Sequence, residues 1–224
     1  MNDAQRSWPA RVIEDLAQHL LRSGIDGVGP LDAASEVAAK ARAASPTDEP
    51  AIDRIIRDHV VLAASEGFLT SLGGFITMSV ALPANVVAFH VLATRMVAAI
   101  AGVCGHDIST DTVRAAVLLV LADEDAADIL RRAGVPTGSS RLTSFALREL
   151  PRPALMAVNK GIAFRLLVRF GEKSFSDLGR LLPGVGGLIG GGIDAYLMRG
   201  IGQRAGREFT AVDATEASPR TIDS

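Results

Sequence analysis

The sequence predicts an all-α fold, a single helical domain with a central apolar helical hairpin and a glycine-rich C-terminal helix. Aromatic residues make up only 4% of the chain, whereas alanine, leucine and arginine, which favour helix, are abundant. We find no stretch with the alternating pattern of a β-strand. At 224 residues the chain is long enough to bury a sizeable core. We divide it into an N-terminal helical arm (1–46), a helical domain (47–210) and a flexible polar tail (211–224).

Three helices are expected in the N-terminal part. The first, over residues 9–23, carries one apolar stripe and is broken by Gly24 and the glycines that follow. The second, over residues 33–44, is rich in alanine. The third begins at Thr47, where a capping residue, two acids and a proline come in succession, and it extends to about Glu66.

Five more helices are expected in the rest of the chain. A proline, a Ser-Thr-Asp run and an aspartate supply the start signals of the first three. Glycine and proline residues supply the stop signals. The expected ranges are 83–102, 109–121, 123–134, 154–170 and 186–209.

Residues 68–94 contain no Asp, Glu, Lys or Arg, and this stretch is longer than the roughly 20 residues that cross a bilayer. Polar and helix-breaking residues interrupt it, however, and a buried helical hairpin in a soluble core has the same pattern. We therefore favour a soluble domain with a very apolar centre, resting on a membrane, over an integral protein. The interrupting residues are Gly73, Gly74, Pro83, Asn85 and His90.

The glycine-rich segment over residues 181–194 holds six glycines and a single charge, that of Asp194. Glycine gives up helix propensity but permits close backbone approach to a helix, a lipid or a ligand. The pairs Gly187/Gly191 and Gly202/Gly206 have the small-xxx-small spacing of close helix contacts. If Asp194 is buried, we expect it to fix the register of this helix by pairing with Asn159, Lys160 or Arg165.

The net charge of −2 conceals an acidic and a basic region. Residues 1–130 carry a net charge of −8, and residues 131–207 carry +9. The two regions either neutralise each other by packing or leave a basic patch for phosphate groups. In residues 148–173 the cations interleave with an apolar stripe, which suits a membrane surface better than nucleic acid. The alternative is a solvated arginine face over an ordinary core stripe.

Known catalytic motifs are absent or incomplete. The run GEKS at 171–174 lacks the upstream glycine of a phosphate-binding loop, and no G-x-S-x-G is present. His59, the dipeptide His106-Asp107 and Asp194 follow the H…HD…D order of metal phosphohydrolase ligands, but nothing else supports such a site. We interpret His59 as a surface histidine, His106 as a loop residue and Cys104 as an inert core thiol.

Several motifs resemble those of the EcsC family of bacterial proteins. The C-terminal ones are VNKGIAFRLL (158–167), FGEK (170–173), LPGVGGLIGGGIDA (182–195) and IGQRAGR (201–207). The central ones are GG (73–74), LPA (82–84) and GHD (105–107). The resemblance covers about residues 50–209 in order. It implies a helical fold and a membrane-proximal role, because the founding member is named for its gene's place beside an ABC-transporter pair, but it implies no reaction.

The leading hypothesis is a non-enzymatic helical protein that docks on an anionic cytoplasmic leaflet or binds an apolar, lipid-like ligand. The first alternative is a soluble adaptor or homo-oligomer that binds a protein partner through its glycine-rich helix. The second is an enzyme that uses Asp194 with Asn159, Lys160 or His106. The N-terminus has no apolar signal core and the chain has one cysteine, so we expect a cytoplasmic protein, peripheral on the inner face of the cell membrane.

No cofactor, metal, catalytic residue or nucleic-acid partner is predicted. The residues expected to bind the membrane or ligand are Lys160, Arg165, Arg169, Lys173, Arg180, Gly186, Gly187, Gly190, Gly191 and Asp194.

Overall fold

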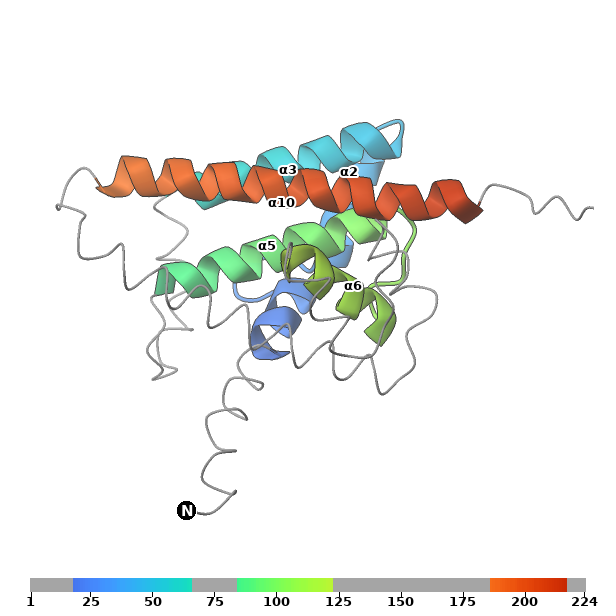
Figure 1. The fold of residues 1–224 in the computed structure, drawn as a ribbon, viewed down its shortest axis with the longest axis horizontal. Helices are drawn as coiled ribbons and strands as arrows, with labels where there is room; N and C mark the ends of the chain where they lie inside the picture. The colour runs from blue at the N-terminus through green and yellow to red at the C-terminus, as the bar shows by residue number, and fades with distance from the viewer. Residues whose placement is uncertain (1–17, 66–83, 123–185, 217–224) are drawn as a thin grey trace, which may run out of the picture.

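The structure, a computed structural model, describes residues 18–65, 84–122 and 186–216. Over these three stretches the chain forms six helices and no β-strand, which confirms the predicted all-α helical domain (Figure 1). The first helix covers residues 18–26. The others are α2 (Ala34–Ala43), α3 (Asp48–Ala64), α5 (Ala84–Val103), α6 (Asp111–Ala122) and α10 (Gly186–Glu216).

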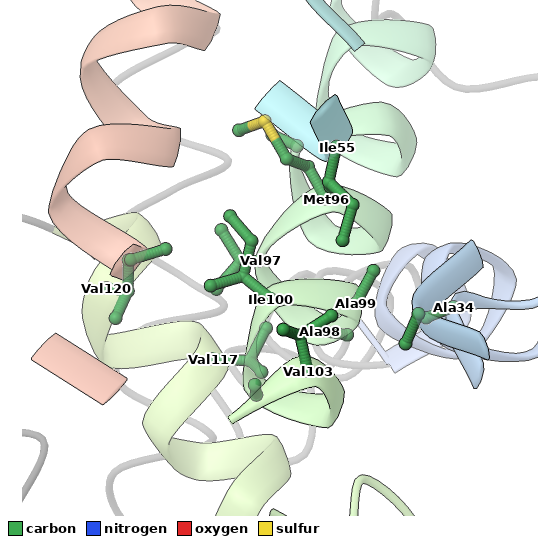
Figure 2. Packing of buried hydrophobic residues seen from close by; sticks show 14 of the residues in the cluster. Ala34, Ile55, Met96, Val97, Ala98, Ala99, Ile100, Val103, Val117 and Val120 are labelled. Atoms are coloured by element: carbon green, nitrogen blue, oxygen red, sulfur yellow. The ribbon is translucent and has the colours of Figure 1, made fainter. Parts of the chain in front are cut away.

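Helix α5 is the centre of the domain. Every residue from 91 to 101 is buried, because α2, α3, α6 and α10 all pack against this helix. A helix that carries apolar residues on every face requires such a cover. Figure 2 shows Met96, Val97 and Ile100 of α5 between Ile55 of α3 and Val117 of α6. The rest of the predicted apolar hairpin, residues 68–83, lies outside the described residues, as do the helices expected over 123–134 and 154–170.

Helix α10 lies along α3 and α5 (Figure 1), and two of its glycines make the contact close. A Cβ atom at Gly202 would lie 2.7 Å from Cγ1 of Ile56 and 3.1 Å from Sδ of Met96. A Cβ atom at Gly206 would lie 3.3 Å from Cγ2 of Ile52. The residue numbers rise along α3 as they fall along α10, so the two helices are antiparallel. The close approach predicted from the Gly202/Gly206 spacing is therefore confirmed.

The first helix does not break at Gly24, and that prediction was wrong. The helix continues to residue 26 and ends at Gly27, whose φ of 84° is one that glycine adopts readily. A Cβ atom at Gly24 would lie 2.6 Å from Cβ of Thr94 on α5. Gly24 therefore lies within the first helix, where the absence of a side chain lets the backbone of this helix approach α5.

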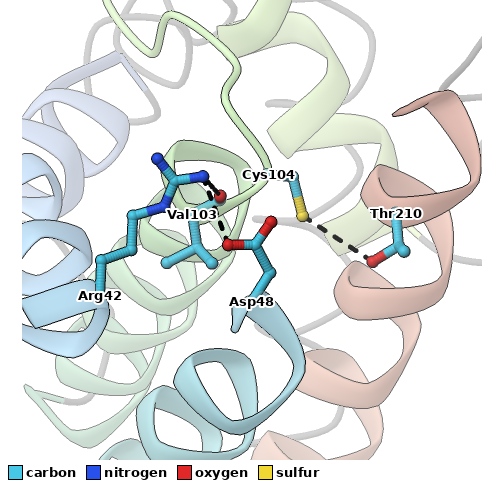
Figure 3. A network of polar contacts seen from close by, with 5 residues as sticks. All are labelled: Arg42, Asp48, Val103, Cys104 and Thr210. Carbon is cyan, nitrogen blue, oxygen red and sulfur yellow. Dashed lines mark hydrogen bonds and ion pairs between the residues drawn. The ribbon is translucent and has the colours of Figure 1, made fainter. Parts of the chain in front are cut away.

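Polar contacts join several helix ends (Figure 3). The guanidinium of Arg42, at the end of α2, donates to the carbonyl oxygen of Val103 and pairs with Asp48 at 3.4 Å. Val103 is the last residue of α5 and Asp48 the first of α3, so one side chain links three helix ends. Nearby, Sγ of Cys104 lies 3.8 Å from Oγ1 of Thr210, which connects the end of α5 to α10. Cys104 is buried, as expected of a core thiol.

Candidate functional site

The predicted membrane-binding residues are only partly covered by the structure. The five cations lie outside the described residues, and their role stays a prediction; they are Lys160, Arg165, Arg169, Lys173 and Arg180. The four predicted glycines belong to the first turns of α10; they are Gly186, Gly187, Gly190 and Gly191. Asp194 follows at a half-buried position of the same helix. The partners expected for it, Asn159, Lys160 and Arg165, are outside the described residues.

Helix α10 has two distinct faces between residues 192 and 210. One face is buried against α3 and α5, at Met198, Gly202, Ala205 and Phe209. The exposed positions, which we call the α10 outer face, are Gly192, Tyr196, Leu197, Arg199, Gly200, Gln203, Arg207 and Thr210. These positions include two arginines and no carboxylate, so the α10 outer face carries a net positive charge.

The α10 outer face also includes large apolar side chains that are exposed. Tyr196 is 78% exposed and Leu197 is 42% exposed, and Val61 of α3 is 63% exposed; these are the exposed large hydrophobic residues of the described stretches. The antiparallel register of Ile52 with Gly206 and Ile56 with Gly202 continues toward Val61 and Leu197. The three exposed side chains therefore belong to neighbouring turns of α3 and α10.

A second feature, inside the molecule, is a pair of buried polar side chains on α3 and α5. His59 is only 1% exposed, so its interpretation as a surface histidine was wrong. Its Nδ1 lies 2.8 Å from the carbonyl oxygen of Ile55, and a carbonyl can only accept, so Nδ1 carries the hydrogen and donates. Burial lowers the pKa of His59 to about 4, with a smaller contribution from the charge of Arg95. The ring is therefore neutral near pH 7, and its Nε2, which is buried and has no hydrogen-bond partner, is an acceptor.

The other member of the pair is Arg95, on α5. It is 8% exposed, and its Nε and Nη1 atoms are buried without a hydrogen-bond partner. Burial lowers the pKa of Arg95, and the carboxylate of Asp32 acts in the opposite direction. Asp32 is nevertheless ion-paired with Lys40, at 2.5 Å. The sequence did signal this site, because Arg95 is the sole Asp, Glu, Lys or Arg between Glu66 and Asp107.

The remaining candidate site residues lie in the turn between α5 and α6. The ring of His106 lies 5.5 Å from the ring of Phe209, centroid to centroid, and its Nε2 is buried without a hydrogen-bond partner. Asp107 accepts hydrogen bonds from the backbone and the hydroxyl of Ser109, which lower its pKa. Within the described stretches, no three His, Cys, Asp or Glu side chains gather closely enough to hold a metal ion.

The fold and these features define a class of all-α domains in which a central apolar helix is covered by a long C-terminal helix. Among the helices that the structure describes, none combines the length and the apolarity needed to cross a membrane. The family model described as "EcsC protein family" matches residues 37–211, and the chain belongs to the EcsC family. No curated protein and no solved structure matches the chain.

Proposed function

We propose that this protein is a non-enzymatic, membrane-associated helical protein that docks on the anionic cytoplasmic leaflet through the α10 outer face. The observation that carries the proposal is the composition of that face. It combines the highly exposed Tyr196 with Arg199 and Arg207 and contains no exposed carboxylate. Tyrosine favours the boundary between water and lipid, where its ring is apolar and its hydroxyl stays hydrated.

Electrostatic attraction also supports docking with the α10 outer face toward the membrane. Each Lys or Arg near an anionic leaflet contributes about 1 kcal/mol of attraction. The α10 outer face supplies Arg199 and Arg207, and residues 131–207 as a whole carry a net charge of +9. Leu197 and Val61 add apolar area beside Tyr196. We therefore expect binding to combine a salt-sensitive attraction with shallow insertion of apolar side chains.

A vesicle-pelleting assay tests the proposal. The protein should pellet with vesicles that contain phosphatidylserine but not with purely neutral phosphatidylcholine vesicles. Binding should weaken as salt is raised, because surface charges are screened beyond about 8 Å at physiological ionic strength. Equal binding to both vesicle types, or binding to neither, would contradict the proposal.

Charge-reversal variants locate the docking face. The double variant Arg199→Glu/Arg207→Glu should lose most of the binding to anionic vesicles. Arg22→Glu, compared with each of the single variants Arg199→Glu and Arg207→Glu, is the matched control, because Arg22 is also an exposed arginine on a helix but belongs to the first helix. Equal losses in the control and the single variants would show that only net charge matters and would remove the α10 outer face from the proposal.

One observation favours a second candidate, the helix-mediated homo-oligomer. Gly192 and Gly200 both lie on the α10 outer face, and a Cβ atom at either would meet nothing within 4 Å. They are two helical turns apart, so a second helix could approach along one line. Sedimentation equilibrium of the purified protein tests this candidate. A dimer that Gly200→Leu dissociates would support it, and a monomer at all concentrations would exclude it.

A further inference from the structure

The exposed apolar side chains of the described helices gather at one end of the pair formed by α3 and α10. Val61 lies near the end of α3, and Tyr196 and Leu197 lie in the first half of α10. No other large hydrophobic residue of the described stretches is exposed. In Figure 1 this is the left end of the pair, where α3 finishes and α10 begins. Apolar side chains that are exposed as a group, rather than singly, mark contact surfaces.

The packing of α3 on α10 also places two arginines at this end. Gly202 lies against Ile56, and the two antiparallel helices rise by the same distance per residue. Positions equally far from this contact are therefore level with each other. Arg199, three residues before Gly202, is level with the position three residues after Ile56. That level lies between Arg57 and Val61 of α3.

The two arginines are free to meet an anionic partner. Arg57 and Arg199 are exposed, and neither forms an ion pair with a carboxylate of the described residues. Asp58, the exposed carboxylate that follows Arg57, lies 3.8 Å from Arg54, which offsets its charge. This end of the pair therefore combines two cations with three exposed apolar side chains.

The opposite end of the pair has the reverse character. Arg207, the other arginine of the α10 outer face, is one residue beyond the contact of Gly206 with Ile52. It is therefore level with the first turns of α3, where Glu49 and Asp53 are exposed. These carboxylates offset the charge of Arg207 and are repelled by an anionic surface. The two ends of one helix pair thus differ in their attraction to a membrane.

We propose that the protein docks on the anionic leaflet in a tilted orientation, with only the first of these ends against the lipid. Its arginines contact lipid phosphates, and its apolar side chains enter the head-group boundary. The inference rests on the proposed function, to which it adds an orientation and a part for α3. The contact surface, which we call the docking end, consists of Arg57, Val61, Tyr196, Leu197 and Arg199.

Single charge reversals test the orientation on vesicles that contain phosphatidylserine. One charge that reaches an anionic leaflet changes binding about fivefold, so Arg57→Glu and Arg199→Glu should each weaken binding by at least about tenfold. Arg207→Glu should weaken it by no more than about threefold, because Arg207 lies farther from the lipid. Arg22→Glu, on the first helix, is the control for net charge.

The outcomes separate this inference from the proposed function. Equal losses in Arg199→Glu and Arg207→Glu would overturn the tilted orientation and leave the docking itself intact. A loss in Arg57→Glu no larger than that in Arg22→Glu would likewise remove α3 from the contact. Failure of the wild-type protein to pellet with anionic vesicles would overturn both proposals.

Tryptophan fluorescence measures which end enters the lipid. In a Trp8→Phe background, which removes the only tryptophan of the chain, one tryptophan is introduced at a time. Brominated phosphatidylcholine in the anionic vesicles should quench Val61→Trp and Tyr196→Trp strongly. Thr210→Trp is the matched control, because Thr210 is exposed on the same face of α10 at the opposite end. Equal quenching at Thr210 and Tyr196 would show that α10 lies flat, and no quenching at Val61 would exclude α3; either result would overturn the proposal.

The same variants without lipid show whether the docking end is free. Val61→Trp and Tyr196→Trp should emit as water-exposed indoles at every protein concentration. A blue shift that appears only at high concentration would indicate a second copy on this surface. A blue shift independent of concentration would indicate that another segment of the chain covers it. Either shift would overturn the proposal.

Discussion

Gly200 and Gly202 are two residues apart on α10, yet they have opposite surroundings. Gly202 lies against Ile56 and Met96 so closely that a Cβ atom would clash, whereas Gly200 has open space around it. The difference comes from the helical turn, which directs neighbouring positions to opposite faces. The comparison teaches that a glycine-rich helix can hold two kinds of glycine, one that permits packing and one that leaves a surface open.

The buried face of α10 should be the more sensitive of the two to mutation. Phe209 is fully buried, and Phe209→Ala should lower the free energy of unfolding by about 3–5 kcal/mol because a large cavity replaces the ring. Tyr196→Ala is the matched change on the α10 outer face, and we expect it to alter stability by less than about 0.5 kcal/mol. Urea unfolding measures both. Similar losses would mean that α10 is packed on both faces.

The α3–α5 packing beneath α10 should weaken in acid because of His59. Its pKa is about 4 in the folded protein and about 6.5 in an unfolded chain, so the unfolded state binds more protons between these values. Stability is therefore fully present above pH 6.5 and is lost as the pH falls toward 4, by up to about 3 kcal/mol in total. Urea unfolding from pH 7 to pH 4 should show a shallower decline in His59→Phe than in wild type. Parallel curves would place His59 in contact with water.

The close contact at Gly202 should be the next most sensitive feature. Gly202→Leu forces a side chain into Ile56 and Met96, and we expect a loss of about 1–3 kcal/mol from overpacking. The midpoint of urea unfolding at pH 7 measures it. A variant as stable as wild type would show that α10 can shift away from α3 without cost, and the two faces would then differ less than the structure indicates.

Gly200→Ala should have the smallest effect and the opposite sign. The added methyl group meets nothing, and alanine favours helix over glycine, so stability should rise by about 0.5–1 kcal/mol. The same substitution at Gly202 is the control and should not stabilise the protein. A destabilised Gly200→Ala variant would indicate that a second molecule already occupies the α10 outer face in solution.

Much of the described fold could be predicted from local signals. The starts of α3 at Asp48 and of α6 at Asp111 were predicted from their start signals. At α6, Thr110 accepts a hydrogen bond from the backbone N–H of Val113, whereas at α3 the side chain of Thr47 makes no capping hydrogen bond. Helix α10 starts at Gly186 as predicted but continues to Glu216, beyond the expected end near Phe209. The inward placement of Gly24 could not be predicted in this way, because a packing glycine and a helix-breaking glycine have the same local sequence.

The candidate site was less accessible to sequence reasoning. Position 59 continues the apolar spacing of Ile52, Ile55 and Ile56, and this spacing indicates a buried side chain at His59. Which face of α10 stays exposed depends on the contacts of Gly202 and Gly206 with α3, a helix far away in the sequence. The distinction between an exposed arginine such as Arg199 and a buried one such as Arg95 likewise required the packing of complete helices.

The packing of α10 on α3 and α5 has a consequence for synthesis on the ribosome. Ile52, Ile56 and Met96 are translated long before Gly202 and Phe209, so the nascent chain carries this apolar surface without its C-terminal cover. Exposed apolar surface of this kind attracts chaperones and promotes aggregation. A premature stop before Met198 would make the exposure permanent, so such truncated chains should be cleared by proteases. Quality control of this protein therefore depends on the synthesis of α10.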